Sequence, residues 1–156
     1  MLGLFKANSD ANLQSVGWWG LGSVIRNDPG LVMAIATWRI KGANDVMMAE
    51  VFALLLTVRI ARDFGFRHMV FEVDNDKMVR MAQKNKIDNI SYLGKVIYEI
   101  GALKSSSDTC HFRYISWNCN EVAHTMAQLA HSSTNKVWIE EVPLEVQEVY
   151  YHDILI

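Results

Sequence analysis

The segment HMVFEVDND, residues 68–76, lies near the middle of the 156-residue chain and has the pattern of a strand that is buried in a sheet. Its apolar and β-branched residues are followed at once by acidic residues. A strand of this kind carries the carboxylate of Asp74 to the edge of a sheet, where the ligands of open α/β sheets gather. We therefore expect Asp74 to lie at a functional site, together with side chains from other strand ends.

Length and composition indicate a single compact domain. A chain of this size can bury roughly 68–70% of its unfolded surface without the help of metals or disulfides. Hydrophobic residues make up 51% of the chain and charged residues 21%, and the two prolines leave no room for a Pro-rich linker.

Cysteine usage and hydropathy indicate the compartment. Cys110 and Cys119 do not make a disulfide framework, and we find no signal peptide, so we expect an intracellular protein, nuclear or cytoplasmic. The longest apolar stretch, residues 46–58, contains Glu50 and is shorter than the roughly 20 residues that span a bilayer. We expect no membrane segment.

The charge balance limits the kind of nucleic-acid binding that is open to the chain. A net charge of −2 and a pI near 6.2 argue against a strongly basic binder, because phosphate neutralisation supplies most non-specific affinity. Any nucleic-acid role must rest on local patches or on metal ions.

Periodicity and turn chemistry predict a mixed α/β sheet. A hairpin is predicted at the Asp28-Pro29-Gly30 turn, which gives antiparallel pairing, and the strand-helix-strand units that follow give parallel pairing. Asn120 and Ser91 are suitable N-caps, and Gly65 is a suitable C-cap. The predicted strands are residues 4–10, 20–25, 31–39, 69–73 and 111–115, and the predicted helices are residues 46–64, 76–83, 91–103 and 120–131. An acidic amphipathic tail, residues 136–156, is expected to pack on the domain formed by residues 1–135.

Five segments occur in the order found in one known family. The segments are KANSDA (6–11), GLGSVIR (20–26), AEVFAL (49–54), FEVDND (71–76) and NEVAHTMA (120–127). They resemble the ribonuclease H-like domain of plants, the reverse-transcriptase-like branch of type 1 ribonuclease H, and the resemblance covers roughly residues 4–131.

This resemblance implies a fold, a reaction and a set of site residues. The fold would be a five-stranded mixed sheet, three antiparallel strands followed by parallel strands, with helices on both faces; residues 1–135 would form this domain. The reaction would be endonucleolytic hydrolysis of the RNA strand of RNA–DNA hybrids, leaving a 5′-phosphate and a 3′-hydroxyl. The implied catalytic and metal-binding residues are Asp10, Glu50, Asp74 and, at the fourth position, His124. Two divalent ions about 4 Å apart can activate water and stabilise the leaving oxygen, and Mg²⁺ prefers hard oxygen ligands.

The fourth position departs from the family pattern. Active members commonly have Asp where this chain has His124, and a neutral imidazole removes one negative charge and suits Mn²⁺ or Zn²⁺ better than Mg²⁺. The expected cofactor is Mg²⁺ or Mn²⁺, with activity that is weakened, Mn²⁺-preferring or absent. The alternative is a catalytically degenerate module that binds nucleic acid, or binds a protein partner through its acidic tail.

Substrate contacts also depart from the pattern. Met47 and Val46 replace asparagines of bacterial and retroviral relatives, and Tyr114 replaces a histidine. Lys77, Arg80 and Lys84 place positive charge on one side of the helix after Asp74 at spacings i, i+3 and i+7, and we add Asn12 as a fourth nucleic-acid-binding candidate. Asn12 also argues against a 3′-to-5′ exonuclease of the same superfamily, whose Asp-x-Glu motif needs a carboxylate there.

Each of these residues has a simpler interpretation. Asp10 and Asp74, taken singly, are typical strand-ending turn residues, whereas Glu50 is more informative because a carboxylate in an apolar helix is costly to bury without a partner. His124 fits a surface histidine as well as a ligand. The basic residues fit a solvated helix face, the spacing of the cysteines and histidines matches no standard zinc site, and the tryptophans Trp18, Trp19, Trp38 and Trp117 fit core or rim packing as well as base stacking.

Overall fold

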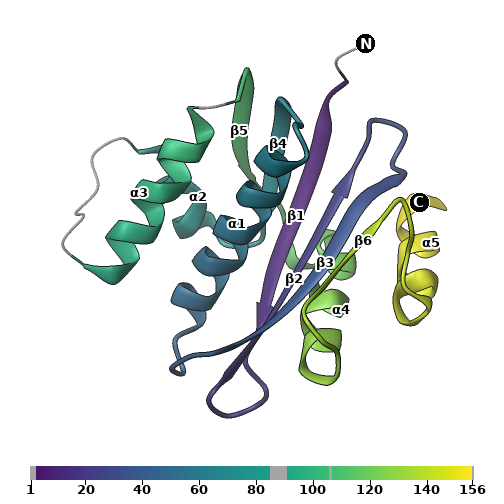
Figure 1. Cartoon of the computed structure of the whole chain (residues 1–156), viewed down its shortest axis with the longest axis horizontal. Helices are drawn as coiled ribbons and strands as arrows, with labels where there is room; N and C mark the ends of the chain where they lie inside the picture. Colours follow the sequence, from purple (N-terminus) through teal and green to yellow (C-terminus); the bar gives the residue numbers. More distant parts are fainter. Residues whose placement is uncertain (1–2, 85–90, 106, 156) are drawn as a thin grey trace.

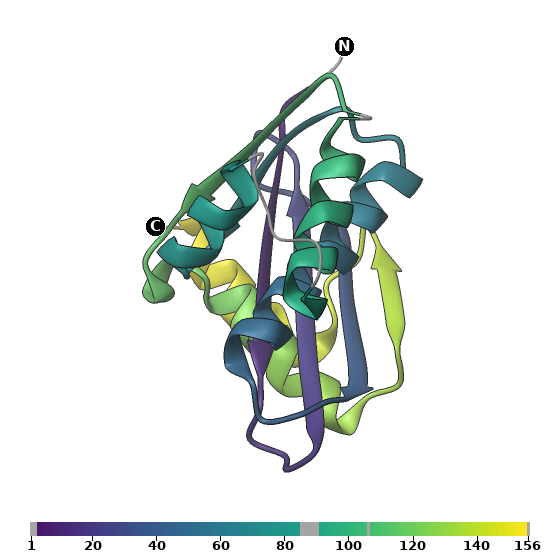
Figure 2. The same ribbon diagram turned by 90° about the vertical axis from the view of Figure 1, so that its left-hand side faces the viewer.

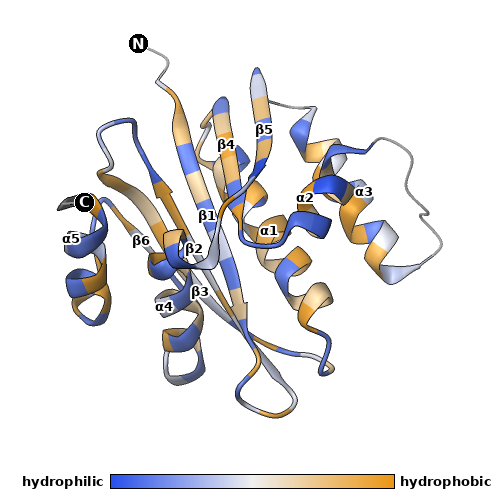
Figure 3. Ribbon diagram, turned by 180° about the vertical axis from the view of Figure 1, so that it is seen from behind, coloured by the Kyte–Doolittle hydropathy of each residue, from blue (hydrophilic) through white to orange (hydrophobic). Residues whose placement is uncertain are grey.

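The structure is a computed structural model, and it describes residues 3–84, 91–105 and 107–155. One mixed sheet runs through the molecule (Figure 1), and bands of hydrophobic and hydrophilic residues alternate along its central strand β1 (Figure 3). The strands lie side by side in the order β5 (Thr109–Tyr114), β4 (His68–Val73), β1 (Phe5–Asn12), β2 (Trp18–Arg26), β3 (Val32–Lys41) and β6 (Lys136–Ile139).

The first three strands form an antiparallel meander. In it Asp10 of β1 lies opposite Gly22 of β2. The predicted turn closes β2 onto β3, with the amide of Gly30 donating to the carbonyl of Asn27 at 2.9 Å. Gly30 has a φ of +96°, a conformation that favours glycine, so the turn chemistry seen in the sequence does set this hairpin.

The next two strands run parallel to β1. Asn8 of β1 pairs with Glu72 of β4, so Asp10 and Asp74, each two residues further on, lie side by side near the carboxyl ends of the two strands. Helix α1 (Val46–Asp63) makes the crossover from β3 to β4, and Asp45 caps it by accepting from the amide of Met48 at 3.0 Å. The strand order therefore brings two of the predicted site residues together.

Helices cover both faces of the sheet, as the two views in Figures 1 and 2 show. Leu21 and Ile25 of β2 belong to the core under α1 and α3 (Tyr92–Lys104), whereas Val24, which points the opposite way, packs in a second core with α4 (Glu121–Leu129). Helix α2 (Asp76–Gln83) contacts β5. Short 3₁₀ turns occur at Trp117–Cys119, Ala130–Ser132 and Leu144–Val146.

Gly22 allows α4 to lie against the sheet. A Cβ on this residue would stand 2.4 Å from the amide nitrogen of Ala127 and 2.5 Å from the carbonyl oxygen of Ala123, both of them backbone atoms of α4. No side chain fits in that space, and Gly20, whose Cβ would stand 2.3 Å from the carbonyl oxygen of Ala127, serves helix packing in the same way.

The sheet has six strands, one more than the five expected, although the mixed α/β fold class itself is confirmed. The additional strand is β6, which pairs antiparallel with the edge of β3. Its four residues, KVWI, show no periodicity that would identify a strand in the sequence. Their conformation is set by pairing with β3, which lies about 100 residues earlier in the chain. After it, α5 (Gln147–Leu155) packs on α4, with Val146 and Tyr150 buried in the second core.

Among the described residues, no helix combines the length and the apolarity needed to cross a bilayer.

Candidate metal centre

Three carboxylates from distant parts of the chain meet at one edge of the sheet. Asp10 comes from β1, Glu50 from the second turn of α1, and Asp74 from the residue after β4. One carboxylate oxygen of each lies within 4.8 Å of the others, and among the described residues this is the one group of three or more acidic, histidine or cysteine side chains with such spacing. The three residues predicted to act together do lie together.

Asp10 is the most buried member of the group, with 6% of its surface exposed. Burial raises the pKa of its carboxyl, and the charge of Asp74 raises it further, while a hydrogen bond from His124 and one from the Ala11 amide lower it. The ionised form of Asp10 is therefore disfavoured unless a cation binds among the three carboxylates.

Glu50 is held by a residue that sequence reasoning did not assign to the site. The side chain of Asn75 donates from Nδ2 to Glu50 Oε2 at 2.7 Å, while its Oδ1 caps α2 by accepting from the amide of Met78 at 3.0 Å. The N-cap position was visible as Asn directly before a predicted helix, but its contact with Glu50 joins separate elements and has no signature in the sequence. Burial, more than any neighbour, raises the pKa of Glu50 to about 7, and the charges of Asp74 and Asp10 add to the effect.

His124 is joined to the group through Asp10. Its Nδ1 lies 2.9 Å from Oδ2 of Asp10, and half of its side chain is exposed. When a cation keeps Asp10 ionised, the carboxylate can only accept, so Nδ1 donates to it, and in a neutral imidazole Nε2 then keeps a free lone pair. His124 lies beside the three carboxylates and contacts one of them.

The carboxylates open into a pocket of about 420 Å³. Its wall includes a fourth acidic residue, Glu121, and the indole of Trp117, and none of its described lining residues is a lysine or arginine. The lining is Asp10, Ala11, Glu50, Asp74, Trp117, Glu121, His124, Thr125 and Val149. Among these described lining residues only His124, through its hydrogen bond to Asp10, offsets part of the acidic charge.

These residues fit a hard divalent cation. Carboxylate oxygens are the ligands that Mg²⁺ and Mn²⁺ prefer, and the mutual repulsion that raises two of the pKa values is relieved when a cation binds. Such a centre can polarise a phosphoryl oxygen and lower the pKa of a bound water.

The predicted nucleic-acid-binding residues do not line the pocket of the centre. Lys77 is exposed on α2, and Arg80, one turn on, forms an ion pair with Asp76 at 3.0 Å. Lys84 is exposed at the end of the same helix. Asn12 ends β1, where its side-chain oxygen accepts from the amide of Gln14 at 3.1 Å.

A buried polar network, also absent from the sequence prediction, connects the start of α4 to β1. The Asn8 amide donates to Asn120 Oδ1 at 3.2 Å and to Glu72 Oε1 at 3.3 Å, and Asn120 Nδ2 donates to the carbonyl of Ser9 at 3.0 Å. Since Ser9 precedes Asp10 and Asn120 precedes α4, this network fixes the helix that carries His124 relative to the strand that carries Asp10.

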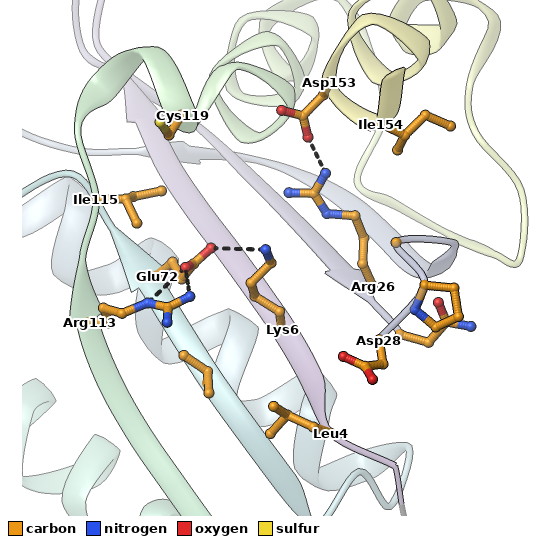
Figure 4. A pocket seen from close by; sticks show the side chains of 14 residues that line it. Leu4, Lys6, Arg26, Asp28, Glu72, Arg113, Ile115, Cys119, Asp153 and Ile154 are labelled. Atoms are coloured by element: carbon orange, nitrogen blue, oxygen red, sulfur yellow. Dashed lines mark hydrogen bonds and ion pairs between the residues drawn. The ribbon is translucent and has the colours of Figure 1, made fainter. Parts of the chain in front are cut away.

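Glu72, a member of this network, also lines a second pocket of about 540 Å³ (Figure 4). There Lys6 and Arg113 both point toward Glu72, and Arg26 pairs with Asp153 of α5 (Figure 4). Lys6 and Arg113 share Glu72, and the arrangement joins β1, β2, β4, β5 and α5. With Asp28 also in the lining, the three cations are balanced by three carboxylates, which leaves little net charge for a ligand.

Fold and site together define a ribonuclease H-like α/β domain with an acidic centre at the edge of its sheet. The sequence profile of the family described as reverse transcriptase-like matches residues 8–130, and the chain belongs to this family. No curated protein sequence matches the chain.

Solved structures of RNase H enzymes share the fold. RNase H1 from the halophilic archaeon Halobacterium salinarum superposes with a TM-score of 0.76 at 22% identity, over 83% of this chain and 98% of that one. The N-terminal RNase H domain of a Mycobacterium tuberculosis protein gives a TM-score of 0.73 at 20% identity, over 83% and 94%. LC11-RNase H1, solved in complex with an RNA/DNA hybrid, gives 0.70 at 20% identity, over 81% and 95%. At these identities the likeness shows the fold, and the expected ribonuclease H-like architecture is confirmed.

Proposed function

We propose that this chain is a divalent-metal-dependent nuclease of the ribonuclease H type that hydrolyses the RNA strand of RNA–DNA hybrids. The observation that carries the proposal is the approach of Asp10, Glu50 and Asp74 to within 4.8 Å of one another on a fold of this family. A hybrid complex of a protein with the same fold supports the choice of substrate.

In this proposal the three carboxylates hold Mg²⁺ or Mn²⁺, and Asp10 is the most buried of them. When bound, the metal supplies Lewis-acid stabilisation of the phosphoryl oxygens and an activated water. Asn75 orients Glu50 by donating to Oε2, so that the other oxygen remains for the cation. A carboxylate that is already oriented loses less conformational entropy when the metal site assembles.

His124 takes the position where the family pattern has Asp. Its Nδ1–H donates to Asp10, and the free Nε2 can accept a proton or contribute a neutral ligand. The side chain supplies one negative charge fewer than Asp, and we therefore propose that the centre works better with Mn²⁺ than with Mg²⁺.

The hybrid would be held outside the acidic pocket. Lys77, Arg80 and Lys84 follow Asp74 on α2 and at its end, and in this proposal they neutralise phosphates on one side of a bound duplex. Asn12 adds a polar group at the end of β1. Each phosphate contact steepens the dependence of binding on salt.

A second candidate function follows from His124. Because its Nδ1 bonds to Asp10 and a carboxylate is missing at the fourth position, the domain is also compatible with a degenerate module that binds without cutting. Its partner would be nucleic acid, or a basic protein that contacts the exposed glutamates of the tail, Glu140, Glu141, Glu145 and Glu148.

A labelled RNA–DNA hybrid, incubated with the protein in Mg²⁺ and then in Mn²⁺, tests the proposal. Asp74→Asn is the inactive reference, and Asp76→Asn, which changes an exposed carboxylate two residues away, is the matched control. We expect cleavage by the wild type and by Asp76→Asn, stronger in Mn²⁺, with 5′-phosphate ends. Binding without cleavage above the Asp74→Asn level would select the degenerate module, and absence of both would refute the nucleic-acid role.

A further inference from the structure

Trp117 differs from the other tryptophans in the described parts of the chain. It is 74% exposed, the highest exposure of any aromatic residue there. Trp19 is buried and donates from Nε1 to the carbonyl of Ala43 at 2.7 Å, and Trp18 lies under the guanidinium of Arg39 at 3.7 Å. Within the described residues, the indole of Trp117 makes no such contact. An exposed, unpartnered indole is available to a ligand.

The backbone that carries this indole is fixed. Trp117 opens the 3₁₀ turn after β5, where its carbonyl accepts from the amide of Asn120 at 3.0 Å and the amide of Cys119 donates to Ser116 at 2.9 Å. Asn120 is tied in turn to the carbonyl of Ser9, the neighbour of Asp10. The backbone position of Trp117 relative to Asp10 is therefore set by hydrogen bonds, and the residue lines the pocket of the metal centre.

The described lining of the pocket offers a nucleotide no lysine or arginine side chain, so an aromatic surface there adds attraction of another kind. Four carboxylates and no lysine or arginine occur among its described lining residues, so a phosphate there meets repulsion from the protein itself. Stacking of a base on an aromatic ring does not depend on charge or on base identity. The indole supplies binding energy where basic side chains are missing.

We propose that Trp117 is a substrate-contacting residue whose indole stacks on the nucleotide next to the scissile phosphate. This inference rests on the proposed function. Bases inside a continuous duplex already stack on one another, whereas unpaired bases are free to stack on aromatic side chains. The preferred substrate is therefore a hybrid with an unpaired nucleotide beside the cleaved bond, at an end, a nick or a bulge.

Binding is measured by fluorescence anisotropy with labelled hybrids in Mn²⁺, using the Asp74→Asn background to keep the RNA intact. We expect Trp117→Ala to weaken binding of a hybrid with one unpaired nucleotide by roughly 5- to 100-fold, the range that one stacked base contributes. Trp117→Phe should retain most of the affinity. The control is Phe64→Ala, an aromatic residue 41% exposed at the far end of α1, about 20 Å along the helix from Glu50.

Salt dependence separates stacking from an indirect electrostatic effect. The slope of log affinity against log salt should be the same with and without the indole, whereas Lys77→Ala, which removes a proposed phosphate contact, should reduce it. Equal affinity of Trp117→Ala and its parent, or a loss that disappears at high salt, would overturn the inference and leave the proposed function standing. If the Asp74→Asn background does not bind, KM for cleavage by wild type and Trp117→Ala decides in its place. A wild type that neither binds nor cleaves hybrids would refute the proposed function, and this inference with it.

Discussion

Replacement of Glu50 by Gln is expected to stabilise the metal-free protein at alkaline pH and to weaken its response to metal. Glu50 has an ordinary pKa of 4.5, and burial raises it to about 7 in the folded protein. The folded state therefore binds the proton more tightly than the unfolded state does. The stability this provides is fully present below pH 4.5 and is lost as the pH rises through about 7. Gln keeps the acceptor for Asn75 and removes the charge.

The size of the effect follows from the pKa. Each pKa unit corresponds to about 1.36 kcal/mol, which sets an upper limit of about 3 kcal/mol. Because Glu50 is partly exposed, solvent screening reduces the expected gain to about 1–2 kcal/mol at pH 8. For a domain of this size, that corresponds to a rise in Tm of roughly 2–8 °C.

Thermal unfolding in EDTA, followed by circular dichroism at pH 5 and pH 8, measures this. The difference in Tm between Glu50→Gln and wild type should be larger at pH 8 than at pH 5, and Mg²⁺ or Mn²⁺ at pH 8 should raise the Tm of wild type more than that of the variant. Glu148→Gln, which changes an exposed carboxylate on α5, is the control and should shift Tm little at either pH. A Tm difference that does not grow with pH would show that Glu50 does not carry a disfavoured charge, and the electrostatic account of the site would be wrong.

Three further substitutions test other parts of the structure. His124→Asp should raise Mg²⁺-dependent cleavage by about tenfold or more, equivalent to ~1.4 kcal/mol, and should lower Tm in EDTA because it adds a charge beside Asp10. Unchanged kinetics with an intact fold would place His124 outside the metal site. Asn75→Ala removes both the N-cap of α2 and the hydrogen-bond donor to Glu50, and should lower the free energy of unfolding measured in urea by about 1–2 kcal/mol. A loss of stability below the error of the measurement would contradict this dual role. Gly22→Ala should lower the free energy of unfolding by about 1–3 kcal/mol or more, because the added Cβ meets backbone atoms of α4. If the variant is as stable as wild type, α4 can move away from the sheet at no cost.

The acidic centre illustrates how a functional site is maintained at the expense of stability. Burial and mutual repulsion raise the pKa of Asp10 and of Glu50, so the empty, ionised group destabilises the fold. The surrounding polar network compensates, since Asn75 and Asn120 each join elements that carry site residues. A bound divalent ion is therefore expected to stabilise the fold as well as to serve as the catalytic cofactor.

Local chemistry in the sequence was enough to predict most elements, whereas the acidic site residues were predicted as a set from the resemblance to ribonuclease H-like domains. The run at residues 68–73 predicted β4, the turn at residues 28–30 predicted the hairpin, and residues 76–83 are helical within the bounds expected. Glu50 was informative because a carboxylate in an apolar helix needs a partner. These features depend on neighbours a few positions away, which is why periodicity and turn residues are sufficient to find them.

Tertiary structure alone decided the sixth strand, the partner of Glu50 and the surroundings of His124 and Trp117. Strand β6 exists because β3 offers it an open edge, and Asn75 reaches Glu50 because α1 and the end of β4 meet in space. His124 and Asp10 are separated by 114 positions, and whether Trp117 is buried or exposed depends on which elements pack around its turn. The sequence by itself determined which groups are able to bind a metal, since this follows from residue type and local pattern. Which of them meet, at what distance and with what charge, depends on long-range packing that no local pattern encodes.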